Sequence, residues 1–242
     1  MDYIFRFENG ALKPIINFTD IGIGDLIGID TQIGIFKRNL EYFLDGKPFL
    51  DVLLWGERGC GKSSLVKAFA NEYKDRLLKV VELRVRQVDK IYALYEIFSN
   101  KTHEYFIVFF DDISFDEQDE EYRKFKSIIE GGLEEKPPNV MFVATSNKRH
   151  LIKDRALTTN SIYNRDEINE QMSLYGRFGL VLGFKQPDKN VYLEIVKFYL
   201  QKFSVHEFDG WEKEAEAFAI SKGARNGRVA KQFVISKIIG IL

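Results

Sequence analysis

Short apolar runs alternate with amphipathic segments along the first three quarters of the chain. The run 105–110 contains six consecutive apolar residues, a pattern typical of a strand covered on both faces of a parallel sheet. Between such runs, apolar residues recur at helical spacing, as at Phe36, Leu40 and Phe43. The pattern therefore predicts an α/β fold with a doubly wound, five-stranded parallel sheet sandwiched by helices. The predicted strands are 50–55, 77–83, 105–110, 140–144 and 179–184.

The two ends of the chain depart from this alternation. Asn9-Gly10 lies between two short apolar runs and predicts a β-hairpin, which we expect to be an extension outside the main sheet. Beyond Pro187 only helical periodicity remains. Before it, the polar segment 148–175 has no clear periodicity, and no regular structure is predicted for it. The predicted C-terminal helices are 188–203, 210–222 and 227–239. The predicted parts are a hairpin extension (1–20), an α/β nucleotide-binding domain (21–186) and a small all-helical lid domain (187–242).

Composition limits the compartment and the partners. A formal net charge of −1 over 242 residues argues against a broad basic face for duplex DNA, although a local basic groove is compatible with a neutral average. Cys60 is the only cysteine, so an internal disulfide is excluded and a reducing cytoplasm is expected. No apolar run approaches the ~20 residues that span a bilayer, and we expect no membrane partner.

Residues 56–63 read G-E-R-G-C-G-K-S, a full match to the phosphate-binding pattern G-x-x-x-x-G-K-[ST]. A predicted strand precedes this glycine loop and a predicted helix follows it, as the pattern requires. Backbone N–H groups and the helix N-terminus would surround the phosphates, Lys62 would reach the terminal phosphates, and the Ser63 hydroxyl would ligate Mg²⁺. ATP or ADP with Mg²⁺ is the predicted ligand. The predicted phosphate-binding residues are Gly56, Glu57, Arg58, Gly59, Cys60, Gly61, Lys62, Ser63 and Ser64.

Two carboxylates, Asp111 and Asp112, follow the apolar run 105–110. Because ligands of parallel sheets bind beyond the carboxyl ends of the strands, we expect Asp111 to lie near the glycine loop and to hold Mg²⁺ through water. Asp112 would then orient and deprotonate the attacking water. The alternative for such a pair is a solvated turn, which the preceding buried run disfavours.

These motifs occur in the order typical of the AAA+ ATPase superfamily, and the resemblance extends over about 16–233. Asn147 stands at the position of that superfamily's sensor 1, Arg177 at its arginine finger and Arg228 at its sensor 2. Three phrases resemble the bacterial AAA+ family catalogued as domain of unknown function 815. They are 111–115 (DDISF), 145–151 (TSNKRHL) and 227–233 (GRVAKQF).

The resemblance implies roles for further residues. Ile27 and Gly28 would pack on the base, and Asn147 would bind the γ-phosphate or the attacking water. Arg177 would enter the site of a neighbouring subunit, so that hydrolysis requires a homo-oligomer, a hexamer or a filament. Arg228 would contact phosphate from the lid, with Arg225 as the competing candidate. The alternatives are a turn residue for Asn147 and a surface ion pair for Arg177.

One departure concerns the rate of hydrolysis. Most of the superfamily has Asp-Glu where this chain has Asp111-Asp112, and the missing methylene withdraws the base by ~1.5 Å. Because a general base must lie within ~2.6–3.2 Å of its proton or act through water, slow hydrolysis is expected.

Three functions are compatible with these residues. The first is an ATPase that remodels or loads a macromolecular partner, protein or nucleic acid. The second is an initiator-like or helicase-loader-like ATPase that binds single-stranded DNA. The third is a small-molecule kinase, which shares the glycine loop but leaves Asn147, Arg177 and Arg228 without a role.

Overall fold

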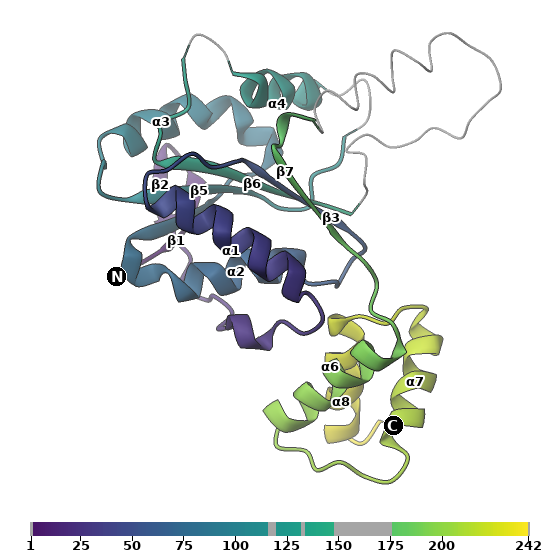
Figure 1. The fold of residues 1–242 in the computed structure, drawn as a ribbon. Helices are drawn as coiled ribbons and strands as arrows, with labels where there is room; N and C mark the ends of the chain where they lie inside the picture. The colour runs from purple at the N-terminus through teal and green to yellow at the C-terminus, as the bar shows by residue number, and fades with distance from the viewer. Residues whose placement is uncertain (1, 116–119, 132–133, 148–175, 242) are drawn as a thin grey trace, which may run out of the picture.

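The computed structural model describes residues 2–115, 120–131, 134–147 and 176–241 (Figure 1). Its centre is a seven-stranded sheet with the order β2-β1-β4-β5-β6-β3-β7. The strands are β1 (Ile4–Glu8), β2 (Ala11–Pro14), β3 (Val52–Gly56), β4 (Leu78–Glu82), β5 (Tyr105–Phe110), β6 (Val140–Ser146) and β7 (Leu180–Phe184). The five strands from β3 to β7 pair in parallel, which confirms the predicted α/β fold.

The N-terminal hairpin is part of this sheet, and the expectation that it lies outside was wrong. β1 pairs in parallel with β4, with Ile4 beside Val80, and β2 pairs antiparallel with β1. Ile4 and Phe7 are buried in hydrophobic clusters on opposite faces of the sheet, as suits an inner strand. The strand count is therefore seven and not five, because a pairing across more than 70 positions leaves no local pattern in the sequence.

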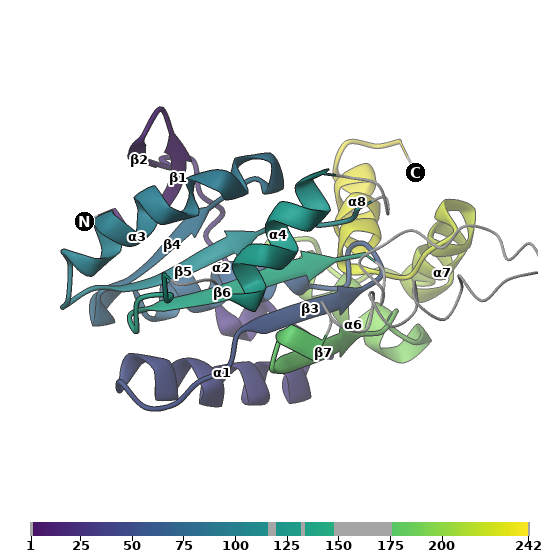
Figure 2. The ribbon, with the colours of Figure 1, turned by 90° about the horizontal axis from the view of Figure 1, so that it is seen from above.

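Helices cover both faces of the sheet (Figures 1 and 2). One buried cluster joins α1 (Asp30–Leu44) and α2 (Lys62–Glu72) to one face. A second cluster joins α3 (Ile91–Ser99) and α4 (Glu120–Glu130) to the other. Three short 3₁₀ helices, η1 (Ile23–Asp25), η2 (Lys74–Arg76) and η3 (Val85–Lys90), complete this part. The predicted start of α4 near residue 117 and the segment 148–175 lie outside the described residues.

The C-terminal helices α6 (Lys189–Lys202), α7 (Trp211–Lys222) and α8 (Gly227–Ile238) pack on one another around their own buried cluster. Figure 1 shows them as a separate layer beyond the end of β7. Asp188 caps α6 and Asn226 caps α8, each accepting a hydrogen bond from the backbone N–H three residues on. We call these three helices the lid. In the described part of the chain, no helix combines the length and the hydropathy that crossing a bilayer requires.

Candidate functional site

A cavity of about 1100 Å³ lies where the carboxyl edge of the sheet meets the lid. The glycine loop, the ends of β5 and β6, and the first residues of α8 line it. The sheet order explains this convergence, because β6 lies between β3 and β5 and all three strands point the same way. Open α/β sheets bind ligands at this edge.

The glycine loop joins β3 directly to α2. Gly56 has φ +142°, and a Cβ there would lie 2.0 Å from the carbonyl oxygen of Phe184 on β7, so only glycine fits. Gly61 is left-handed at φ +96°, and α2 begins at the next residue. The loop therefore ends with the N-terminal N–H groups of α2 facing the cavity edge.

Lys62 is 7% exposed, and its ammonium group uses all of its hydrogen-bonding capacity. Nζ donates to the carbonyl oxygens of Gly56 at 2.6 Å and Glu57 at 2.8 Å, and to Oδ1 of Asn147 at 3.1 Å. Burial lowers the pKa of Lys62, and the carboxylates of Asp111 and Asp112 act in the opposite direction. The ammonium group thus lies within the loop, held by two backbone carbonyl oxygens and by Asn147.

Asp111 lies beside Ser63, as the sequence predicted. Ser63 Oγ donates to Asp111 Oδ1 at 2.6 Å, and Thr145 Oγ1 on β6 donates to the same oxygen at 2.7 Å. Thr145 was not predicted. It also accepts the N–H of Asp112 at 2.7 Å, so a single buried hydroxyl fixes both carboxylate residues. Its only sequence signal is its place near the end of an apolar strand.

Asp112 and Asn147 contact each other across the ends of β5 and β6. Nδ2 of Asn147 donates to Oδ1 of Asp112, while Oδ1 of Asn147 accepts from Lys62. Arg58 forms an ion pair with Asp112 at 3.5 Å. Asp112 has φ +54°, a left-handed conformation that is uncommon outside glycine and that aspartate adopts more readily than most residues. A hydrogen-bonded chain therefore connects the loop lysine to the second carboxylate.

The lid contributes to the site through the start of α8. Arg228 lines the cavity, whereas Arg225 forms an ion pair with Glu216 of α7, which raises the pKa of Arg225. Asn226 was not predicted as a site residue. Its Nδ2 donates to the carbonyl oxygen of Arg58 at 3.1 Å, and the next N–H, of Gly227, donates to the carbonyl oxygen of Gly59 at 3.2 Å.

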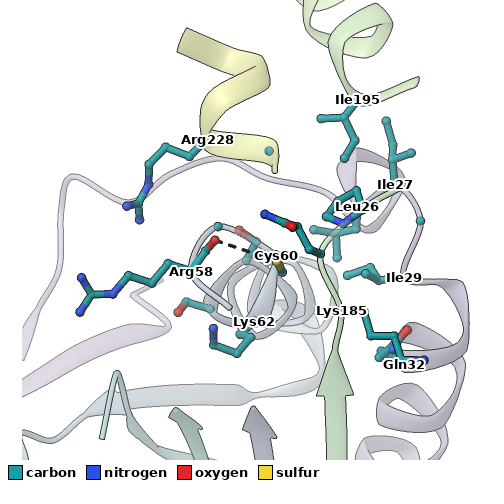
Figure 3. A pocket seen from close by; sticks show the side chains of 18 of the residues that line it. Leu26, Ile27, Ile29, Gln32, Arg58, Cys60, Lys62, Lys185, Ile195 and Arg228 are labelled. Atoms are coloured by element: carbon teal, nitrogen blue, oxygen red, sulfur yellow. Dashed lines mark hydrogen bonds between the residues drawn. The ribbon is translucent and has the colours of Figure 1, made fainter. Parts of the chain in front are cut away.

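The other side of the cavity carries an apolar patch, with Gln32 and Lys185 beside it (Figure 3). Figure 3 shows Leu26, Ile27, Ile29 and Ile195 on the side of the loop opposite Arg58 and Arg228. Gly28 faces α6 so closely that a Cβ there would lie 2.4 Å from Cγ1 of Val191. These residues form a wall shared between the core and the lid.

Arg177 is not among the described residues that line the cavity. Its side chain is 51% exposed, and its Nη2 lies 3.7 Å from Oε1 of Glu130 at the end of α4. Exposed ion pairs of this length are weak, about 0–1 kcal/mol. The guanidinium therefore lies at the surface, outside the lining of the cavity of its own chain.

Cys60 is buried in the loop, and burial raises the pKa of its thiol. Its Sγ lies 3.9 Å from the carbonyl oxygen of Arg58, a contact drawn in Figure 3. The side chain is 6% exposed and belongs to the lining of the cavity.

Residues 2–240 match the family described as "Protein of unknown function (DUF815)". The chain belongs to this family. Over 70 residues, 28% of the chain, it is 43% identical to the replication factor C large subunit of Staphylothermus marinus, strain ATCC 43588 / DSM 3639 / JCM 9404 / F1. That match spans 16% of the relative's length.

Solved structures show the same fold. The Thermotoga maritima RuvB Holliday junction branch migration motor matches with a TM-score of 0.55 at 16% identity. The match covers 90% of this chain and 72% of that one. A single-residue variant of the same RuvB matches with a TM-score of 0.56. At this identity the likeness concerns the fold alone, and the predicted AAA+ type P-loop fold of this DUF815 protein is confirmed.

Proposed function

We propose that this DUF815 protein binds ATP with Mg²⁺ and hydrolyses it, and that it couples the cycle to remodelling or loading a macromolecular partner. The observation that carries the proposal is the meeting of three features at one sheet edge. They are the glycine loop with its buried Lys62, the Ser63–Asp111 hydrogen bond, and the Asp112–Asn147 pair.

The residues fit a nucleoside triphosphate with a divalent cation. The apolar wall at Ile27 and Gly28 suits a base, and the loop N–H groups with Lys62 suit the phosphates. Ser63 and Asp111 supply the hard oxygen ligands that Mg²⁺ prefers, in part through water. The cation would supply charge neutralisation for the phosphates.

Each side chain around the loop would have a different role in hydrolysis. Asp112 would accept the proton of the attacking water, and Asn147 would orient that water or the γ-phosphate. Asn147 already bridges Lys62 and Asp112, so its amide is positioned between the phosphate-binding cation and the base. Arg228 would neutralise phosphate charge from the lid.

Substituting Lys62 tests the nucleotide site. Lys62→Ala should abolish binding of a fluorescent ADP or ATP analogue, while Lys74→Ala, outside the cavity, should bind like the parent chain. Release of inorganic phosphate with water as the only acceptor supports an ATPase. Phosphate appearing only on an added small molecule would indicate the kinase instead. Unchanged affinity in Lys62→Ala would contradict the proposed site.

A homo-oligomer with Arg177 acting in the neighbouring site belongs to the same proposal. The exposed position of Arg177, outside the cavity of its own chain, supports it. The partner macromolecule is proposed to be a nucleic acid or a protein. The names of the two similar proteins, a Holliday junction motor and a replication factor, favour nucleic acid. An ATP-dependent, salt-sensitive mobility shift with single-stranded DNA would support this choice.

A further inference from the structure

The lid holds the outer turn of the glycine loop through one side chain, that of Asn226. Asn226 is 7% exposed and uses both ends of its amide. Oδ1 accepts the N–H of Val229 at 3.0 Å, which caps α8, and Nδ2 donates to the carbonyl oxygen of Arg58 at 3.1 Å. The same side chain therefore begins a lid helix and contacts the phosphate-binding loop.

The backbone reinforces this contact. The N–H of Gly227 donates to the carbonyl oxygen of Gly59 at 3.2 Å. Gly59 has φ +80°, and a Cβ there would lie 2.7 Å from Cγ of Asn226. Glycine is thus required at the centre of the loop for two reasons, its left-handed backbone and the close approach of the lid.

We propose that Asn226 is a positioning residue that fixes the outer turn of the loop from the lid, so that the affinity for a nucleoside diphosphate or triphosphate depends on α8. The proposal rests on the proposed nucleotide site. Two carbonyl oxygens of the loop are directed toward the lid by these bonds, and the N–H groups of the same turn remain available to phosphate oxygens. Preorganised loops bind more tightly because less ordering remains to be done on binding.

Asn226→Ser separates the two roles of the side chain. Serine is also a good N-cap, so α8 should keep its first turn, but serine has no amide to donate to Arg58. Loss of one such hydrogen bond should weaken binding of Mg·ADP by about threefold to tenfold. Asn226→Asp, another good cap that lacks the donor, serves as the second variant if serine destabilises the lid. Asn190→Ser, an exposed asparagine on α6 outside the cavity, is the matched control and should bind like the parent chain.

Amide hydrogen exchange of the nucleotide-free chain supplies a readout that capping alone does not affect. In Asn226→Ser we expect faster exchange across 57–61 and unchanged exchange in α8. Unchanged exchange across 57–61, or unchanged affinity for Mg·ADP in a folded variant, would overturn the proposal. A lower melting temperature with faster exchange confined to α8 would also overturn it, because it would indicate a cap alone.

The failure of this proposal about Asn226 can be distinguished from the failure of the proposed nucleotide site. If the parent chain fails to bind ADP and ATP with Mg²⁺, the nucleotide site itself is wrong. Exchange across 57–61 would still show whether Asn226 fixes the loop. If the parent chain binds nucleotide and Asn226→Ser binds it equally well, only the lid contact is wrong.

Discussion

Asn147 occupies the midpoint of the hydrogen-bonded chain that joins Lys62 to Asp112. Its two amide ends serve groups of opposite charge, an ammonium that donates and a carboxylate that accepts. Aspartate at this position would keep the acceptor for Lys62 and lose the donor to Asp112, and leucine would lose both contacts. At the scale of single residues, the site therefore depends on hydrogen-bond polarity as well as on charge.

Asp112 is the residue whose change should separate binding from hydrolysis. Asp112→Asn should lower kcat by about 10²- to 10⁴-fold, because the amide cannot accept the proton of water. Binding of Mg·ATP should remain, since Lys62 and the loop are untouched. Single-turnover phosphate release checks this, with the exposed Asp209→Asn as control. Hydrolysis at the parent rate in Asp112→Asn would show that Asp112 is not the general base. Faster hydrolysis in Asp112→Glu would support the expectation that the short side chain of Asp112 limits the rate.

Sequence reasoning located the site residues that belong to local motifs better than those whose contacts depend on tertiary placement. Lys62, Ser63, Asp111, Asp112 and Asn147 were predicted, and the structure brings them together. Their pattern is local, because each belongs to the motif 56–63 or stands at or just after the end of an apolar run. Thr145 and Asn226 were missed, since their contacts depend on which strand lies beside which and on where the lid lies.

At the scale of elements, one buried side chain, that of Asn139, connects the start of β6 to the end of α3 by hydrogen bonds. Asn139 is 8% exposed, and its Nδ2 lies within hydrogen-bond distance of three carbonyl oxygens. The distances are 3.0 Å to Phe98, 3.2 Å to Lys101 and 3.0 Å to Glu104. After Pro137-Pro138 this asparagine gives only a turn signal in the sequence. Its role became visible only once the helix and the strand were placed together.

Asn139→Ala should lower the free energy of unfolding by about 1–3 kcal/mol, because buried carbonyl oxygens lose their donor. Urea unfolding followed by circular dichroism measures this. Asn100→Ala, which removes one exposed hydrogen bond to Glu96, should change it by about 0.5 kcal/mol or less. Equal effects in the two variants would show that the three-way contact adds nothing to stability.

At the scale of the whole molecule, the proposed cycle requires more than one chain. Arg177 lies near Glu130 and away from the cavity, so a second copy would have to place its own Arg177 there. The five parallel strands and the helices that cover them could be predicted from periodicity and from the AAA+ resemblance. The pairing of β1 with β4 could not, because its partners are distant in sequence.

Mixing two inactive variants tests the shared site. Arg177→Ala should bind ATP but lose about 10³- to 10⁵-fold in hydrolysis, and Lys62→Ala should bind no nucleotide. A mixture should recover activity, because a Lys62→Ala subunit can supply Arg177 to a neighbour that holds ATP. Steady-state phosphate release across mixing ratios measures the recovery. Co-elution of the two variants without any recovery would exclude an arginine acting between subunits.

The hairpin described with the fold has a consequence for how chains meet one another. β2 is a short edge strand whose exposed Lys13 and Pro14 discourage further pairing, whereas β4, on the other side of β1, is a mostly buried strand. Removing residues 1–20 would leave β4 as an edge strand with unpaired backbone N–H and C=O groups. We expect such a shortened chain to self-associate through the exposed edge of β4. Light scattering should then increase as the protein concentration is raised. We therefore expect the hairpin to keep β4 from pairing with a strand of another copy.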